Sequence, residues 1–183
     1  MLKINFLPFP VLKTDRLLLR QVTPNDADTI LSLRSNDEVM KYIPRPYLRN
    51  KEEALELIAI FDDKIENGIG INWGIAFLDE PEKIIGIIGH YRLKPEHYRA
   101  EVGYMLFPEY NGRGIVSEAL QKVVDYGFND MKLHSIEAIL DPANTASERV
   151  LLKNGFVKEG HFIENEFYEG RFLDSVIYSK LNK

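Results

Sequence analysis

Residues 110–120 read YNGRGIVSEAL and join a glycine-rich turn directly to an amphipathic helix. A strand-like run, residues 101–107 (EVGYMLF), comes before the turn and ends at Pro108. Gly112 and Gly114 let the backbone turn tightly and approach a ligand closely, because glycine has no Cβ. The free N–H groups of the helix's first turn lie at the positive end of the helix dipole. The stretch therefore predicts an anion site, of the kind most often used for phosphate.

The predicted helix is supported by apolar residues spaced for one of its faces. These are Leu120, Val123, Val124, Gly127, Phe128 and Met131. Two other phosphate loops do not fit, because no lysine follows Gly114 and no third glycine completes a dinucleotide fingerprint. From the turn alone, a tight loop capped by Ser117 or Asn111 without any ligand stays open as the alternative.

A second segment, residues 141–156, reads DPANTASERVLLKNGF. It resembles the pattern N-x-x-[A/S]-x-x-x-x-x-x-x-G-F, carried here by Asn144, Ser147, Gly155 and Phe156. Together the two segments resemble the GNAT acyltransferase superfamily, whose acyl-CoA diphosphate lies on a [Q/R]-x-x-G-x-[G/A] turn. Across residues 12–181 the chain looks most like the ribosomal-protein N-terminal (alanine) acetyltransferase branch of that superfamily.

The resemblance implies one acyl-CoA N-acyltransferase domain over residues 1–183, with acetyl-CoA as cosubstrate and no metal. It implies direct acetyl transfer to a primary amine, most simply a protein N-terminal α-amine. A small-molecule amine acceptor, or a non-catalytic CoA-binding domain, are the alternatives. The residues expected to hold the cosubstrate are Met105, Leu106, Phe107, Asn111, Gly112, Arg113, Gly114, Ile115, Val116, Ser117 and Asn144.

Three positions depart from the family pattern. Asn111 stands where the family has Gln, Arg or an aromatic residue, and Val116 stands where it has Gly or Ala. Both positions act mainly through backbone N–H groups, so the anion site is retained. Leu151 occupies the place where many members carry a tyrosine that protonates the leaving thiolate, so that phenol is missing here.

Glu101 and Ser147 are the predicted catalytic residues. An α-amine with a pKa of about 7.7–8.0 costs about 1 kcal/mol to deprotonate at pH 7, whereas a lysine amine costs about 4.6 kcal/mol. A modest base acting through water therefore suffices, and Glu101 opens the strand that leads to the thioester. Its alternative is a glutamate in water or paired with Arg99. In the resembled branch the serine at Ser147 contacts the sulfur; a helix-start hydroxyl that bonds local backbone is the alternative.

Hydrophobic periodicity and turn residues predict the remaining elements. Strands are expected over residues 16–22, 71–78, 83–92, 101–107 and 135–140, with a closing hairpin of 156–163 and 171–179. Helices are expected to begin at residue 24, to run from a cap at Asn50 to residues 67–68, and to cover 144–154. The order indicates an α/β (α+β) fold, with a mixed, mostly antiparallel central sheet and helices on both faces. The loop 42–49 is a candidate wall on the substrate side.

Composition narrows the functional classes. The 183 residues carry a net charge of −5, with a pI near 5.5, which argues against a nucleic-acid surface. There are no cysteines, and the four histidines show no metal-ligand spacing. Pro8 and Pro10 interrupt the apolar N-terminal segment, which predicts neither a membrane span nor a signal peptide. A cytoplasmic protein is expected, with a homodimer left open.

Overall fold

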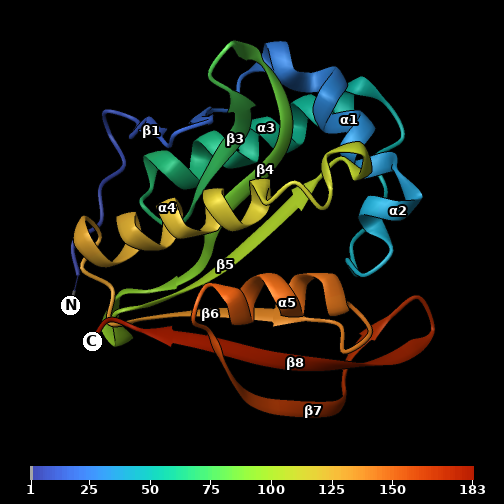
Figure 1. Cartoon of the computed structure of the whole chain (residues 1–183). Helices are drawn as coiled ribbons and strands as arrows, with labels where there is room; N and C mark the ends of the chain where they lie inside the picture. The colour runs from blue at the N-terminus through green and yellow to red at the C-terminus, as the bar shows by residue number, and fades with distance from the viewer. Residues whose placement is uncertain (1) are drawn as a thin grey trace.

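The computed structural model describes residues 2–183, which form one eight-stranded sheet with helices packed on it (Figure 1). The strands are β1 (Leu12–Lys13), β2 (Leu17–Gln21), β3 (Ile71–Phe77), β4 (Glu80–Lys94), β5 (Arg99–Leu106), β6 (Ser135–Leu140), β7 (Val157–Tyr168) and β8 (Arg171–Leu181). The α-helices are α1 (Ala27–Ser35), α2 (Asp37–Met40), α3 (Lys51–Glu66), α4 (Ile115–Asn129) and α5 (Thr145–Lys153). Three short 3-10 turns complete the set: η1 (Pro24–Asp26), η2 (Pro95–His97) and η3 (Pro108–Tyr110).

The strand order in space is β1-β2-β3-β4-β5-β6-β8-β7. Within residues 2–183 every strand pairing is antiparallel except that of β5 with β6, which is parallel. The connection between these two strands is the helix α4, as a parallel pairing requires. The predicted mixed, mostly antiparallel sheet is confirmed.

Helices cover both faces of the sheet, also as predicted. In Figure 1, α4 and α5 lie in front of the sheet and α3 lies behind β3 and β4. The apolar face predicted for α4 is buried in the main core cluster, together with Trp73 of β3 and Leu151 of α5. A second cluster on the opposite face joins α1 and α3 to Ile84 and Ile87 of β4.

The predicted cap and end of α3 are confirmed. The Asn50 side chain caps α3 by accepting a hydrogen bond from the Glu53 N–H at 2.9 Å. The chain then leaves α3 at Gly68, which has a positive φ of 65°. The strands β7 and β8 run farther than predicted, because most β7 side chains are exposed and show no apolar alternation. The short helix α2 was not predicted.

None of the helices in the described part of the chain is long and apolar enough to cross a membrane.

Candidate active site

The strands β5 and β6 separate soon after they meet. They pair over only three positions, from Arg99↔Ser135 to Glu101↔Glu137, although β5 continues to Leu106. On its other side β5 stays paired with β4 as far as Leu106. Figure 1 shows the two strands together at one end and diverging toward the other. The part of β5 beyond Glu101 therefore presents a free backbone edge on the β6 side, which we call the β5–β6 splay.

The predicted anion turn lies at the end of this free edge. Gly112 and Gly114 both have φ of 73°, a left-handed conformation that favours glycine. The side chains or backbone of residues 111–114 are exposed, and a Cβ added at Gly112 would meet no atom within 4 Å. The turn is therefore open on its outer side, and its two glycines are needed for backbone conformation.

The first turn of α4 has no side-chain cap. Its N-cap residue is Gly114, and no side chain accepts a hydrogen bond there. By contrast, Asn50 caps α3 and Asn144 caps α5 through their side chains. Because the first N–H groups of a helix have no partner within it, those of α4 are available to an external acceptor. This arrangement favours a ligand over the alternative of a self-capped loop.

Long-range contacts brace the turn. The Arg16 guanidinium donates to the Arg113 C=O at 3.2 Å and pairs with Glu118 at 2.6 Å. The Thr14 hydroxyl donates to the same Glu118 carboxylate. The pKa of Glu118 is lowered, because these hydrogen bonds outweigh the opposing effect of burial. The N-terminal segment thus holds the first turn of α4 and compensates its carboxylate with a cation.

The side chains of Arg113, Val116 and Ser117 have partners within the protein. Arg113 places its guanidinium 5.6 Å from the ring centroids of both Phe77 and Tyr110, in a cation–π arrangement. The Ser117 hydroxyl accepts a hydrogen bond from the Asn154 side chain at 2.9 Å. Val116 packs, partly buried, against the main core cluster. These contacts leave the main-chain N–H groups as the part of the turn directed to a ligand.

The three cosubstrate residues predicted at the end of β5 are Met105, Leu106 and Phe107. Their main-chain groups do not all point in the same direction. The Phe107 N–H donates to the Ile85 C=O at 3.0 Å, and the Phe107 C=O accepts from the Tyr110 N–H at 3.0 Å. Backbone groups of successive residues point alternately to the two neighbours of a strand. Met105 therefore shares the direction of Phe107, toward β4, while the main chain of Leu106 faces the β5–β6 splay.

Glu101 lies at the last paired position before the splay, directly beside Glu137 of β6. Its carboxylate pairs with Arg92 at 2.9 Å and its side chain is 16% exposed. Burial raises the pKa of Glu101 above its usual range, and Glu137 adds to this, while Arg92 and Arg45 oppose it. A half-buried carboxylate with a raised pKa fits a general base better than an ordinary surface glutamate.

The partner considered for Glu101 from the sequence was wrong. Arg99 pairs with Glu137 at 2.7 Å, not with Glu101, and Lys94 approaches Glu137 at 3.6 Å. The cause is an irregularity in β4 between Tyr91 and Lys94, where Arg92 adopts a positive φ of 43° and turns toward Glu101. The two neighbouring carboxylates therefore have separate cationic partners.

Asn144 and Ser147 begin α5 on the face that carries α4. The Asn144 side chain accepts a hydrogen bond from the Ser147 N–H at 3.1 Å. The Tyr104 hydroxyl, from β5, donates to the Ser147 C=O at 3.4 Å. Leu151, which stands at the position of the missing phenol, is fully buried in the core. The structure thus brings the Tyr104 hydroxyl to the main chain of Ser147, across the splay.

Tyr104 was not among the catalytic residues predicted from the sequence, which were Glu101 and Ser147. Alternation along β5 was the available signal, because Tyr104 shares its face of the sheet with the buried Val102 and Leu106. Burial raises the pKa of Tyr104 to about 12, so the phenol stays protonated at neutral pH.

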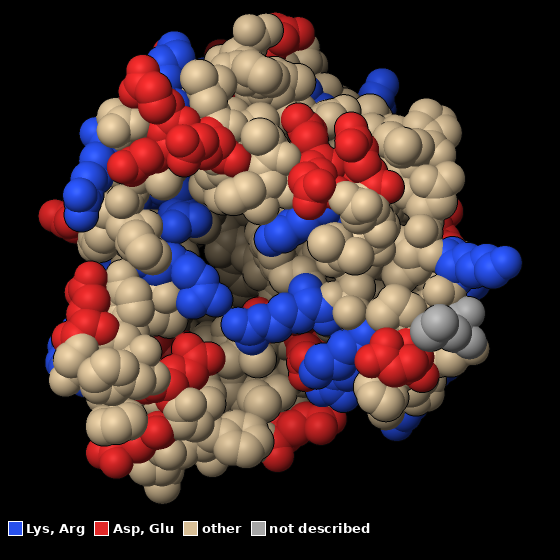
Figure 2. All heavy atoms as spheres, turned by 180° about the vertical axis from the view of Figure 1, so that it is seen from behind, with Lys and Arg blue, Asp and Glu red and all other residues tan. Residues whose placement is uncertain are grey.

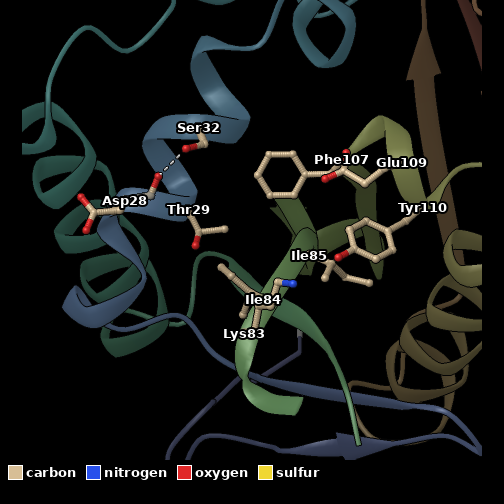
Figure 3. Close-up of a pocket in the computed structure, with 9 residues that line it drawn as sticks. All are labelled: Asp28, Thr29, Ser32, Lys83, Ile84, Ile85, Phe107, Glu109 and Tyr110. Carbon is tan, nitrogen blue, oxygen red and sulfur yellow. Dashed lines mark hydrogen bonds between the residues drawn. The ribbon is translucent and has the colours of Figure 1, made fainter. Parts of the chain in front are cut away.

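The rear face of the molecule is hollowed, and Lys and Arg side chains border much of the hollow (Figure 2). A hollow of about 240 Å³ lies between α1 and the start of β4. Figure 3 shows Phe107 and Tyr110 on one side of it, with Thr29 and Ser32 of α1 across from them. Neither Glu101 nor Ser147 lines this hollow of 240 Å³, so it is separate from the predicted catalytic residues.

No group of three or more His, Cys, Asp or Glu side chains within residues 2–183 is arranged to hold a metal ion. His90 is fully buried, with its Nε2 3.0 Å from the Val123 C=O, and burial lowers its pKa to about 4. The neutral ring thus belongs to the packing of β4 against α4.

Comparison with known proteins places the chain in an acetyltransferase family. Residues 16–157 match the family model described as acetyltransferase (GNAT) domain. The uncharacterized N-acetyltransferase YoaA of Bacillus subtilis (strain 168) is 42% identical over 171 residues, which cover 93% of this chain and 96% of YoaA. Spermidine N(1)-acetyltransferase of Vibrio cholerae serotype O1 is 27% identical over 160 residues, covering 87% of this chain and 89% of that enzyme. The crystal structure of ribosomal-protein-S5-alanine acetyltransferase from Vibrio fischeri is 25% identical and superposes with a TM-score of 0.84, covering 95% of this chain and 97% of that one.

Proposed function

The chain belongs to the acetyltransferase (GNAT) family and is an acetyl-CoA-dependent N-acetyltransferase, and we propose that its acceptor is the α-amino group of a protein N-terminus. The observation that carries the proposal is the position of Glu101 where β5 and β6 separate, with the uncapped turn of α4 at the far end of the same strand. An acyl group on the free edge of β5 would be held between the turn and this carboxylate.

Acetyl-CoA supplies the activated acetyl group as a thioester. For its diphosphate we propose the main-chain N–H groups of residues 112–117, at the start of α4, which has no side-chain cap. The Asn111 N–H, expected from the sequence to take part, donates instead to the Pro108 C=O at 3.0 Å. The fit rests on the open side of Gly112 and on the bracing of the turn by Arg16. For the pantetheine amides we propose the main chain of Leu106 and the side chain of Asn144, which lie on the two sides of the splay.

Glu101 would receive the proton that the amine loses as it attacks the thioester carbonyl carbon. An α-amine needs only about 1 kcal/mol to become neutral at pH 7, against about 4.6 kcal/mol for a lysine amine. Glu101 shares its environment with Arg92, which opposes the rise of its pKa, so it is a base of modest strength. This strength matches an α-amine better than a side-chain amine.

The departing sulfur needs a hydrogen-bond donor, because the tetrahedral adduct collapses by breaking the C–S bond. The Tyr104 hydroxyl lies at the main chain of Ser147 in this part of the splay. We propose this hydroxyl and that of Ser147 as the donors. With a pKa of about 12, Tyr104 would stabilise the thiolate by a hydrogen bond, while water completes its protonation.

Relatives of both acceptor classes exist. The ribosomal-protein-S5-alanine acetyltransferase covers almost the whole chain and supports a protein N-terminus. The spermidine N(1)-acetyltransferase supports a polyamine as the second candidate. Cations around Glu101 disfavour the polyamine, because a polycationic acceptor would meet Arg92 and Arg45 there.

The test is release of free thiol from acetyl-CoA by the purified protein with short peptides or polyamines as acceptors. Acetylation of peptides with a free N-terminus, and none of the same peptides blocked at that end, is the expected result. Acetylation of spermidine and of no peptide would replace this proposal by the polyamine alternative.

A further inference from the structure

Two arginines near Glu101 have no carboxylate partner. Neither Arg34 nor Arg45 forms an ion pair within residues 2–183. The Arg34 Nη2 donates only to the Pro46 C=O at 3.0 Å, and its buried Nε has no acceptor. The Arg45 Nη1 donates to the C=O of its neighbour Pro44 at 2.9 Å. Both guanidinium groups thus retain more N–H donors than the protein satisfies.

Backbone contacts place Arg34 on the face of the sheet that carries Glu101 and join it to the loop that contains Arg45. Arg34 lies in the last turn of α1, and its C=O accepts from the Leu48 N–H at 3.1 Å. Leu48 in turn packs on the second core cluster together with Met105 of β5. Since side chains two and four residues apart share a face of a strand, Met105 and Glu101 point to the same side.

The electrostatic effects agree with this placement. Burial lowers the pKa of Arg34, and the charge of Arg45 adds to this effect. Arg45 also opposes the rise in the pKa of Glu101. Tyr91 of β4 pairs directly with Glu101 of β5. Burial raises the pKa of Tyr91, and the charge of Arg34 opposes this rise. Two cations close to each other and without an ion-pair partner repel one another, and a bound anion would relieve that repulsion.

The whole neighbourhood is cationic although the chain is acidic. Glu101 and Glu137 are met by Arg92, Lys94 and Arg99, so these two carboxylates are already compensated before Arg34 and Arg45 are added. The chain as a whole has a net charge of −5. A local excess of positive charge in such a chain marks a place where an anionic group is bound.

We propose that the acceptor carries an acidic side chain close behind its α-amine and that Arg34 and Arg45 bind this carboxylate while the amine faces Glu101. This assignment deepens the proposed function and rests on it, because it takes the acceptor to be a protein N-terminus. A guanidinium binds a carboxylate through two parallel N–H donors, which gives orientation as well as affinity.

The experiment compares three peptides that differ only at their second and third positions, which are both aspartate, both alanine or both lysine. We expect kcat/KM for the aspartate peptide to exceed that for the alanine peptide about tenfold, with the lysine peptide poorest. In R34Q, R45Q and the double variant the ratio of aspartate to alanine peptide should fall toward one, mainly through KM. R149Q, an exposed arginine on α5, is the matched control and should keep the ratio.

Equal kcat/KM for the aspartate and alanine peptides in the unaltered protein would overturn the inference and leave the proposed function standing. A preference that survives in the double variant would also overturn it. If no peptide were acetylated, the proposed function itself would fail. The peptide series needs no substitution, so the inference stays testable even if a variant does not fold.

Discussion

Glu101 of β5 and Glu137 of β6 lie side by side at the last position where the two strands pair. Their carboxylates do not share a cation: Arg92 pairs with Glu101, while Arg99 and Lys94 approach Glu137. Beyond this position the strands separate, so the pair of carboxylates stands at the inner end of the β5–β6 splay. Neutral substitutions of Arg92 and of Glu137 should therefore shift the pKa of Glu101, the proposed base, in opposite directions.

Removal of the charge of Arg92 should shift the acidic limb of the plot of kcat against pH in one direction. Removal of the charge of Glu137 should shift it in the other. Arg92 lowers the pKa of Glu101, so R92Q should move the limb to higher pH. Glu137 raises the same pKa, so E137Q should move it to lower pH. All variants are measured on one peptide, so that the titration of the substrate amine is common to them. Shifts of equal sign, or an E101Q variant with an unchanged profile, would exclude Glu101 as the base.

Replacement of Gly112 by alanine should weaken binding of CoA. The strain of an alanine at φ of 73° costs about 1 kcal/mol of folding stability. Gly170, at the turn between β7 and β8, has φ of 79° and equally open surroundings, which makes G170A the matched control. Both variants should lose similar stability in denaturant unfolding, but only G112A should bind CoA less tightly by calorimetry. Equal CoA affinities would remove the turn from the cosubstrate site.

Loss of Arg16 should loosen the anion turn without unfolding the protein. The R16Q variant removes the donors to the Arg113 C=O and leaves Glu118 uncompensated beside the proposed diphosphate site. Because the Arg16 side chain is about half exposed, we expect a fall of about two- to fivefold in CoA affinity, and a smaller fall at high salt. In the double variant R16Q/E118Q the repulsion is absent and part of the affinity should return. A double variant weaker than R16Q would contradict the electrostatic explanation.

Tyr104 should matter for turnover more than for binding. Y104F removes the hydroxyl next to the Ser147 C=O and, with it, a donor for the departing sulfur. We expect kcat to fall at least about tenfold, with CoA affinity unchanged and a stability loss near 1 kcal/mol. Y126F makes the same chemical change on α4, where the ring packs against Trp73, and serves as control. Equal turnover in the two variants would leave Tyr104 as a packing residue.

Burial of His90 should make folding stability depend on pH. Its pKa is lowered from an ordinary 6.5 to about 4, so between these values the unfolded chain binds a proton that the folded protein does not. The contribution is fully present above pH 6.5 and is lost as pH falls toward 4, by roughly 3 kcal/mol in all. H90Q should show a flatter dependence of unfolding free energy on pH over this window, whereas H97Q, at an exposed site, should match the unaltered protein. A parallel dependence in H90Q would assign the acid sensitivity to other groups.

Much of the fold follows from local patterns that act within a few residues. The sequence predicted three such features: the apolar face of α4, the Asn50 cap of α3 and the glycine turn at Gly112 and Gly114. Each depends only on residues that are close together in the chain. The edge strand β7 was drawn too short, since its mostly exposed side chains show no alternation. Leu151 was read as a missing phenol, and the structure adds that it is a core residue.

The turn, its helix and the order of the elements were determined by the sequence itself, because helical periodicity and glycine conformation are local properties. Only the tertiary structure decided which side chains surround the site. Arg92 rather than Arg99 meets Glu101 because an irregularity late in β4 turns it there, and Tyr104 reaches Ser147 across 43 positions of sequence. Such contacts depend on strand register and on the separation of β5 from β6. Both arise from packing between segments that are distant in the sequence, so no local pattern predicts them.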